Sequence, residues 1–334
     1  MTRKEKDFEM FFDESSEIDR EKLQELGVNL EDLDDQKNVV AGTSSLVYFV
    51  DGRDGELVVK KGKDVDPALT AEREYAFLKL LKMRGGEKFF PDVYYYNNVF
   101  DVLISEKIQG EKVSGEFDDH EIEEIAEIVS KLHKPEFSRP GLPGKKREEK
   151  TQYEYLIEQT QFLEKWYRDV QGKFSSVGIS GEDIKTIEKV KQRLLGSLSE
   201  SEESFQNKSF SLIHYDLNPE NIVKTKDGKM VILDWRQASI GDRAMDVAKL
   251  FMKSNFSQTQ KKLFLEKYED TVKDSTIEKR IDVYYPLIRL ASLLWRVRFM
   301  TKDVKRHPEV GKGINRKLFF QRMSEDIDFL KKIN

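Results

Sequence analysis

The feature that most constrains this chain is a polar loop with an isolated aspartate after it. Residues 212–221 read Leu-Ile-His-Tyr-Asp-Leu-Asn-Pro-Glu-Asn, and Asp234 follows thirteen residues later. Short apolar segments precede the loop and precede Asp234, and they predict two strands. Strands that flank one loop would bring Asp216, Asn221 and Asp234 together, so the sequence predicts a site made of two carboxylates and an amide.

These three side chains suit the transfer of a phosphoryl group. A carboxylate such as Asp216 can accept the proton of an attacking hydroxyl group. Asn221 and Asp234 offer oxygen atoms, which are the ligands that Mg²⁺ prefers, and Mg²⁺ also binds the phosphates of a nucleotide. Phosphoryl transfer depends mostly on positioning and charge neutralisation. We therefore predict Asp216 as the catalytic base and Asn221 and Asp234 as metal ligands.

The spacing also resembles that of a known family. His214-x-Asp216-x-x-x-x-Asn221, followed by an apolar segment that ends in an aspartate, resembles the catalytic and metal loops of the protein-kinase-like superfamily. Residues 232–235 (Ile-Leu-Asp-Trp) and 241–248 (Gly-Asp-Arg-Ala-Met-Asp-Val-Ala) resemble its aminoglycoside phosphotransferase and choline kinase branch. The resemblance implies phosphorylation of a small-molecule hydroxyl group, such as that of an aminoglycoside, sugar, aminosugar or amino alcohol, with ATP or GTP as donor.

The implied fold class is α+β and bilobal. A small N-terminal lobe with an antiparallel sheet and one main helix would occupy residues 1–104, of which 1–37 read as an acidic helical extension. Residues 105–110 would form the hinge. Residues 111–334 would form a larger, mostly helical catalytic and acceptor-binding lobe, with a helical insert at about 145–205.

The apolar periodicity is compatible with this division. Strands are predicted at 38–41, 46–50, 56–61, 91–97 and 100–105 and a helix at 70–83; further helices are predicted at 121–132, 150–171, 181–198, 243–253, 257–272, 277–301 and 312–332. Residues 197–208 are rich in Ser and Glu, and we predict a flexible surface link there.

A lysine and a glutamate of the N-terminal part complete the implied nucleotide site. Lys60 ends an apolar strand and would grip the α- and β-phosphates, with Glu74 of the following helix as its partner. A buried ammonium group needs a counter-charge. Lys61 and Glu72 are rivals in the sequence, but Lys61 should face the opposite side of the strand.

Two backbone regions are expected to contact the nucleotide. The turn Gly-Thr-Ser-Ser at 42–45 consists of small residues, and Ser44 and Ser45 would approach the phosphates. The adenine edge would bond to the hinge backbone near Ser105 and Lys107. No Gly-x-x-x-x-Gly-Lys-Ser/Thr motif is present, which argues against a P-loop fold.

Other polar residues have roles that the resemblance only suggests. Asp246 would brace the catalytic-loop backbone, although an acid that favours a helix N-terminus explains it as well. His133 and His214 are expected to be structural. Acceptor candidates near the C-terminal helices are Arg236, Asp242, Tyr284, Tyr285, Arg289, Trp295 and Arg296. An aromatic cage would favour a choline-like acceptor, whereas acidic residues would favour an aminoglycoside. The sequence does not distinguish between these two acceptors.

Composition bounds the partners. The 57 basic and 62 acidic residues give a net charge of −5, so no general attraction to nucleic acid is expected. There is no cysteine, which excludes disulfides and thiolate sites. No run of about 18 apolar residues and no apolar signal core occur, so we expect a cytoplasmic protein without a membrane span. The oligomeric state stays open.

Two alternative functions remain from the sequence. A protein kinase of atypical type is the first, but only eleven residues separate Asp234 from Asp246, and no Ala-Pro-Glu motif follows. A non-catalytic, regulatory nucleotide-binding module is the second. The presence of Lys60, Asp216 and Asn221 together with Asp234 argues against loss of catalysis.

Overall fold

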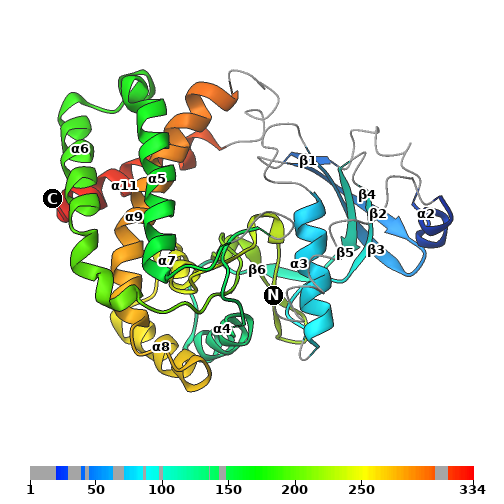
Figure 1. The fold of residues 1–334 in the computed structure, drawn as a ribbon. Helices are drawn as coiled ribbons and strands as arrows, with labels where there is room; N and C mark the ends of the chain where they lie inside the picture. Colours follow the sequence, from blue (N-terminus) through cyan, green and yellow to red (C-terminus); the bar gives the residue numbers. More distant parts are fainter. Residues whose placement is uncertain are drawn as a thin grey trace.

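The structure is a computed structural model in which two lobes are visible, a sheet-based N-terminal lobe and a helical C-terminal lobe (Figure 1). The residues that it describes are 20–28, 39–41, 45–62, 71–85, 88–97, 101–134, 136–142, 148–304 and 315–334. The bilobal α+β fold class that the sequence predicted is confirmed.

The N-terminal lobe is one antiparallel sheet with a helix packed on it. Its strands are β1 (Val39–Ala41), β2 (Ser45–Gly52), β3 (Gly55–Gly62), β4 (Val93–Asn97) and β5 (Val102–Glu106), in the order β1-β2-β3-β5-β4. Helix α3 (Ala71–Arg84) buries Phe77 and Leu81. The short helix α2 (Arg20–Leu26) is the only part of the predicted 1–37 extension in a described helix, and its Leu23 packs with Val59 and Ile104.

The connection between the lobes is shorter than the predicted hinge. Strand β5 continues to Glu106, and β6 (Gly110–Lys112) begins a second sheet, so only residues 107–109 lie between strands. In that sheet β6 pairs with β8 (Ile222–Thr225), which pairs with β9 (Met230–Ile232). Cross-strand pairing therefore holds both ends of the hinge.

Long helices build the C-terminal lobe around α9 (Figure 1). They are α4 (Asp119–Leu132), α5 (Gln152–Val170), α6 (Gly181–Gly196), α7 (Ala244–Lys253), α8 (Gln258–Val272), α9 (Ile277–Arg298) and α11 (Arg316–Lys332). Helix α9 continues into a π-helical turn, Phe299–Asp303. Among the described helices, none has the length and apolar character that crossing a membrane requires.

Short strands and 3-10 turns flank the polar loop that contains Asp216. Strand β7 (Ser211–Ile213) pairs antiparallel with β10 (Ser239–Gly241) and leads into the polar loop. The 3-10 turn η6 (Pro219–Asn221) ends at Asn221, and the 3-10 turn η7 (Trp235–Gln237) begins directly after Asp234. The strand that was expected before Asp234 is β9, which ends at Ile232.

The predicted flexible link at 197–208 is wrong. Most of this segment forms the 3-10 helix η5 (Leu198–Phe205). Leu198 and Phe205 are buried, and the Phe205 ring lies 5.6 Å from the Tyr284 ring of α9. The polar composition misled the prediction, because one buried apolar side chain at each end is enough to anchor a short helical segment to the core.

Candidate active site

The structure brings the three predicted loop residues together. The Asn221 Nδ2 donates to the backbone oxygen of Asp216 at 2.9 Å and lies 3.3 Å from the Asp216 Oδ2. The Leu233 N–H donates to the Asn221 carbonyl at 2.7 Å, which places Asp234 beside the same turn. Two carboxylates and an amide therefore lie close together at the ends of β7, β8 and β9, although these strands belong to two different small sheets.

Two residues of this site have left-handed backbone conformations. Tyr215 has φ 66° and Asp234 has φ 62°, which is uncommon for residues other than glycine. Such conformations persist where surrounding bonds hold them, and they occur often at functional sites. The positive φ of Tyr215 turns the chain between strand β7 and Asp216.

Asp246 supplies the bonds that hold this turn. Its Oδ2 accepts from the His214 N–H at 2.6 Å, and its Oδ1 accepts from the Tyr215 N–H at 2.7 Å. The Asp246 side chain is fully buried at the start of α7. The bracing position that the resemblance implied is thus observed, and a helix-dipole contact alone does not account for it.

Two buried histidines support the same loop. His133 lies 3.1 Å from Asp246 through Nε2 and 3.0 Å from the Tyr268 hydroxyl through Nδ1. Burial lowers the pKa of His133 more than Asp246 raises it. The neutral ring thus donates from Nε2 and accepts at Nδ1. His214 donates from Nε2 to the Leu233 carbonyl at 2.9 Å.

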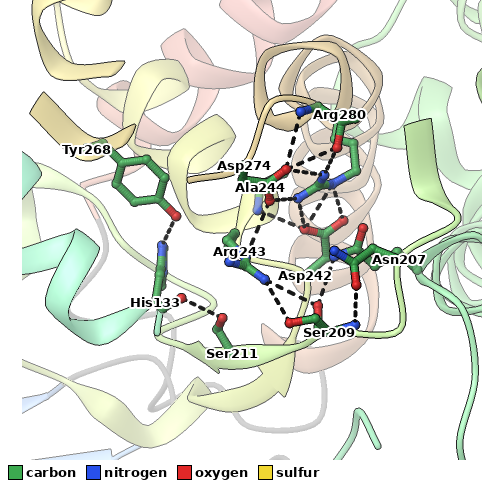
Figure 2. A network of polar contacts seen from close by, with 12 residues as sticks. His133, Asn207, Ser209, Ser211, Asp242, Arg243, Ala244, Tyr268, Asp274 and Arg280 are labelled. Carbon is green, nitrogen blue, oxygen red and sulfur yellow. Dashed lines mark hydrogen bonds and ion pairs between the residues drawn. The ribbon is translucent and has the colours of Figure 1, made fainter. Parts of the chain in front are cut away.

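A buried ionic network lies behind the loop (Figure 2). The Arg280 guanidinium contacts Asp242 at 3.0 Å and Asp274 at 2.8 Å. Asp242 also accepts from the Ala244 N–H at 3.1 Å, at the start of α7. The pKa of Arg280 is raised because the attraction of the two aspartates outweighs its burial. The network ties α9 to the first turn of α7 and so to Asp246.

On the N-terminal lobe, Lys60 is paired as the sequence suggested. Its Nζ lies 2.5 Å from the Glu74 Oε1 and 3.8 Å from the Asp234 Oδ1. Glu74 is only 1% exposed, and its other oxygen faces Arg236 at 3.8 Å. The rival choices Lys61 and Glu72 do not form this pair. The Lys60 ammonium therefore lies between the buried Glu74 carboxylate of its own lobe and the Asp234 carboxylate of the second lobe.

Asp234 is the candidate metal ligand that lies closest to Lys60. Partial desolvation by the surrounding protein raises the pKa of Asp234, but the positive charges of Lys60 and Arg236 lower it more, so the pKa lies below its ordinary value. Its side chain keeps 53% of its surface exposed. An ionised, accessible carboxylate beside the Asn221 amide is an oxygen donor set that fits Mg²⁺ when phosphate oxygens complete the shell.

The remaining predicted nucleotide contacts are less defined. Ser44 lies outside the described residues. Ser45 begins β2, opposite Gly62, and is buried. Ser105 is buried within the sheet, and the Lys107 N–H donates to the Glu56 carbonyl at 3.3 Å. The contact of these residues with a nucleotide stays a prediction.

Lys249 is a site residue that the sequence reasoning missed. Its Nζ lies 3.1 Å from the Asp216 Oδ1. A signal was present, because Lys249 follows Asp246 by three residues on the same face of α7. Four of the proposed acceptor candidates are buried in the protein and are not available to an acceptor, namely Arg236, Asp242, Tyr284 and Arg296.

Comparisons with known proteins bear on the family and the fold of this chain. The model of a family described as the phosphotransferase enzyme family matches residues 35–278. A protein LicA homolog of Mycoplasma capricolum is 34% identical over 76 residues, which are 23% of this chain and 32% of that protein. The chain thus matches about a third of the length of this curated relative.

Solved structures share the fold at low identity. The choline kinase LicA from Streptococcus pneumoniae has a TM-score of 0.61 at 18% identity, over 90% of this chain and 97% of that one. The ADP-bound aminoglycoside phosphotransferase APH(2'')-Ib has a TM-score of 0.53 at 16% identity, over 93% and 97%. Both similarities concern the architecture of the whole chain.

Proposed function

The chain belongs to the phosphotransferase enzyme family, and from this membership we propose that it transfers the γ-phosphate of ATP or GTP to a hydroxyl group of a small molecule. The observation that carries the proposal is the convergence of Asp216, Asn221 and Asp234 on one turn that faces Lys60. Choline kinases and aminoglycoside phosphotransferases are among the similar structures, and their acceptors carry hydroxyl groups.

Each residue has a role that its surroundings support. Lys60, aimed by Glu74, would bind the α- and β-phosphates. Asn221 and Asp234 would hold Mg²⁺, which neutralises phosphate charge when bound. Asp216 would orient the acceptor hydroxyl and accept its proton. The hydrogen bonds that the backbone N–H groups of His214 and Tyr215 donate to the Asp246 carboxylate keep the loop in place, so little reorganisation is needed during transfer.

The structure around Asp234 favours a small acceptor over a protein. The eleven residues between Asp234 and Asp246 form η7, β10 and the start of α7. They leave no segment that could extend along a peptide substrate. A regulatory module without turnover is opposed by the complete set of Lys60, Asp216 and Asp234.

The test is nucleotide turnover in the presence of acceptor pools. Mg²⁺-ATP and Mg²⁺-GTP are offered with aminoglycosides, sugars, amino alcohols and nucleosides, and the release of nucleoside diphosphate is measured. We expect stimulation by one pool. Asp216→Asn should lower that turnover by about 100-fold or more, since a general base contributes at least this much. Nucleotide affinity should stay within about twofold, because Asp216 does not bind the nucleotide.

The exposed Asp328→Asn on α11 serves as the matched control and should behave like the wild type. Wild-type turnover in Asp216→Asn would refute the role of this residue. Nucleotide binding without stimulation by any pool would favour the regulatory module. Phosphorylation of an added protein, but of no small molecule, would favour an atypical protein kinase.

A further inference from the structure

Helix α7 presents two lysines beside the catalytic loop. The Lys249 ammonium lies 3.1 Å from the Asp216 carboxylate. Lys253 follows four residues later, so its side chain leaves the same face of the helix about 6 Å further along. Lys253 also acts electrostatically on Glu220, which lies in the turn η6 of the catalytic loop. Both lysines therefore border the Asp216 side of the C-terminal lobe.

The surroundings of Lys253 are strongly cationic. Arg296 of α9, Arg322 of α11 and Lys249 are its positively charged neighbours, and Asp326 and Glu220 are the opposing anions. Burial is the largest cause, and these positive charges the next, that lower the pKa of Lys253 to about 8. Within the described part of the chain, no carboxylate lies at ion-pair distance from the Lys253 ammonium.

The nearby carboxylates are already engaged. Asp326 pairs with Arg296 and, at 3.0 Å, with Arg289. Glu220 pairs with Arg322. These contacts leave Lys253 as a half-buried ammonium group without a counter-ion from the described protein. Such a group is unfavourable unless an anion from outside compensates it.

We propose that the acceptor carries a carboxylate or phosphate group, which Lys253 binds while the acceptor hydroxyl reaches Asp216. This inference rests on the proposed function and adds the charge of the substrate. The distance of about one helical turn between the two lysines suits a small acceptor in which the anionic group is a few bonds from the reacting hydroxyl.

A cationic acceptor fits these residues poorly. A quaternary ammonium group needs open aromatic faces. Cations of the protein already occupy the Tyr285 ring, because Lys261 lies 5.7 Å and Arg289 5.6 Å from its centroid. Trp295 stacks on Phe299 at 5.2 Å. An amino alcohol would therefore meet several positive charges near Asp216 and no free cage among these rings.

The chemistry of transfer is unchanged by this charge. The acceptor oxygen forms a bond to the γ-phosphorus, and the bond from the γ-phosphorus to the β–γ bridging oxygen breaks. The nucleoside diphosphate leaves with that electron pair. The hydroxyl proton passes to Asp216 and then to solvent. Lys253 stays protonated and holds the anionic group, and Lys249 stops bonding Asp216 as the hydroxyl approaches.

The test compares two series of related acceptors that differ in the charge of one group. Glucose, gluconate, glucose 6-phosphate and glucosamine form one series, and glycerol, glycerate and glycerol 3-phosphate form a shorter one. We expect kcat/KM for an acid to exceed that for its neutral parent at least tenfold. Gluconate and glycerate report on a carboxylate, and the two phosphate esters report on a phosphate. Lys253→Met should lower kcat/KM for the preferred acid 10- to 100-fold, mainly because KM rises.

The matched control is Lys189→Met, an exposed lysine of α6, which should leave all values unchanged. A second measurement does not depend on turnover. Isothermal titration of inorganic phosphate into protein saturated with Mg²⁺ and a non-hydrolysable nucleotide should give binding in the wild type and none in Lys253→Met. Unchanged nucleotide affinity in Lys253→Met shows that the variant is folded.

The outcomes separate the two proposals. Preference for glucosamine or for a neutral parent, or an unchanged KM for the acid in Lys253→Met, overturns the anionic acceptor while leaving phosphotransfer intact. No turnover with any acceptor overturns the proposed function. In that case phosphate binding that depends on Lys253 still supports the anionic site, and phosphate binding that is absent or independent of Lys253 overturns it.

Discussion

At the scale of single residues, Lys253 couples charge to stability. At pH 7 it is protonated in both the folded and the unfolded chain, and the folded state holds that charge among Arg296, Lys249 and Arg322. Because its pKa is lowered on folding from 10.5 to about 8, the unfolded chain binds more protons between these values. The free energy of unfolding therefore rises as the pH increases from 8 to 10.5.

This sign leads to a stability prediction. Lys253→Met should raise the free energy of unfolding at pH 7 by about 1–2 kcal/mol, since one pKa unit corresponds to about 1.4 kcal/mol and residual solvent reduces the effect. The gain should shrink between pH 8.5 and 10 as the wild type loses its proton. Urea unfolding at these pH values measures it, with Lys189→Met as the reference for an ordinary lysine. A gain that does not change with pH would contradict the assigned charge state.

Two lysines show how far single site residues could be predicted from the sequence. Strand alternation was enough to prefer Lys60 over Lys61, because only one of the two can face α3. Lys249 was not found, although the same reasoning applies to helices. Its contact with Asp216 spans 33 positions of sequence and becomes visible only once Asp246 is known to hold the loop. The Asp246 anchor fixes which face of α7 the loop meets.

At the scale of elements, the first turn of α7 controls the shape of the catalytic loop. Asp246→Asn should lower the free energy of unfolding by about 2–4 kcal/mol, because an amide group faces the N–H donors of His214 and Tyr215 with one acceptor instead of two. Turnover should fall with it, since Asp216 follows Tyr215 directly. Chemical unfolding and kcat are measured. The exposed Asp270→Asn of α8 is the control.

The same variant distinguishes a positioning role from a merely stabilising one. If Asp246 positions Asp216, kcat falls at temperatures far below the unfolding transition while nucleotide affinity is retained. A variant that loses stability but keeps the wild-type kcat at low temperature would speak against the positioning role. The conservative change Asp246→Glu should also lower both the free energy of unfolding and kcat, because the extra methylene has no space at this fully buried position.

Elements differed in how well their sequence predicted them. Helices such as α7 and α8 follow apolar periodicity and end within a few residues of the predicted positions. The segment 197–208 failed because its order depends on Phe205, whose burial is decided by Tyr284 of a distant helix. The polar composition of a segment describes that segment alone, whereas its packing also depends on the element against which it packs.

At the scale of the whole molecule, the motif order predicted two lobes, and the structure adds how they are joined. Arg73 of α3 donates from Nε to the Ala238 carbonyl at 2.7 Å and from Nη2 to the Gln237 carbonyl at 2.7 Å. These residues follow Asp234 closely. No local pattern in the sequence could pair a helix of one lobe with a loop about 165 residues away, because the bonds go to backbone carbonyls that every residue has.

These bonds make the alignment of Lys60 with Asp234 dependent on Arg73. Arg73→Ala should lower the free energy of unfolding by about 2–3 kcal/mol, as expected for hydrogen bonds from a charged donor. It should also raise the Kd for the Mg²⁺-bound nucleotide several-fold, because the 3.8 Å separation of the Lys60 ammonium from the Asp234 carboxylate is no longer fixed by α3. Thermal unfolding with and without Mg²⁺-ATP measures both effects.

The control is Lys79→Ala on the same helix, whose ammonium lies over the Tyr75 ring at 5.4 Å, within its own lobe. It removes a positive charge from α3 without touching the second lobe. If inter-lobe bonding is the cause, Arg73→Ala reduces the stabilisation by Mg²⁺-ATP and Lys79→Ala does not. Equal losses in the two variants would assign the effect to the charge of α3, and an unchanged nucleotide response in Arg73→Ala would show that the lobes align without this link.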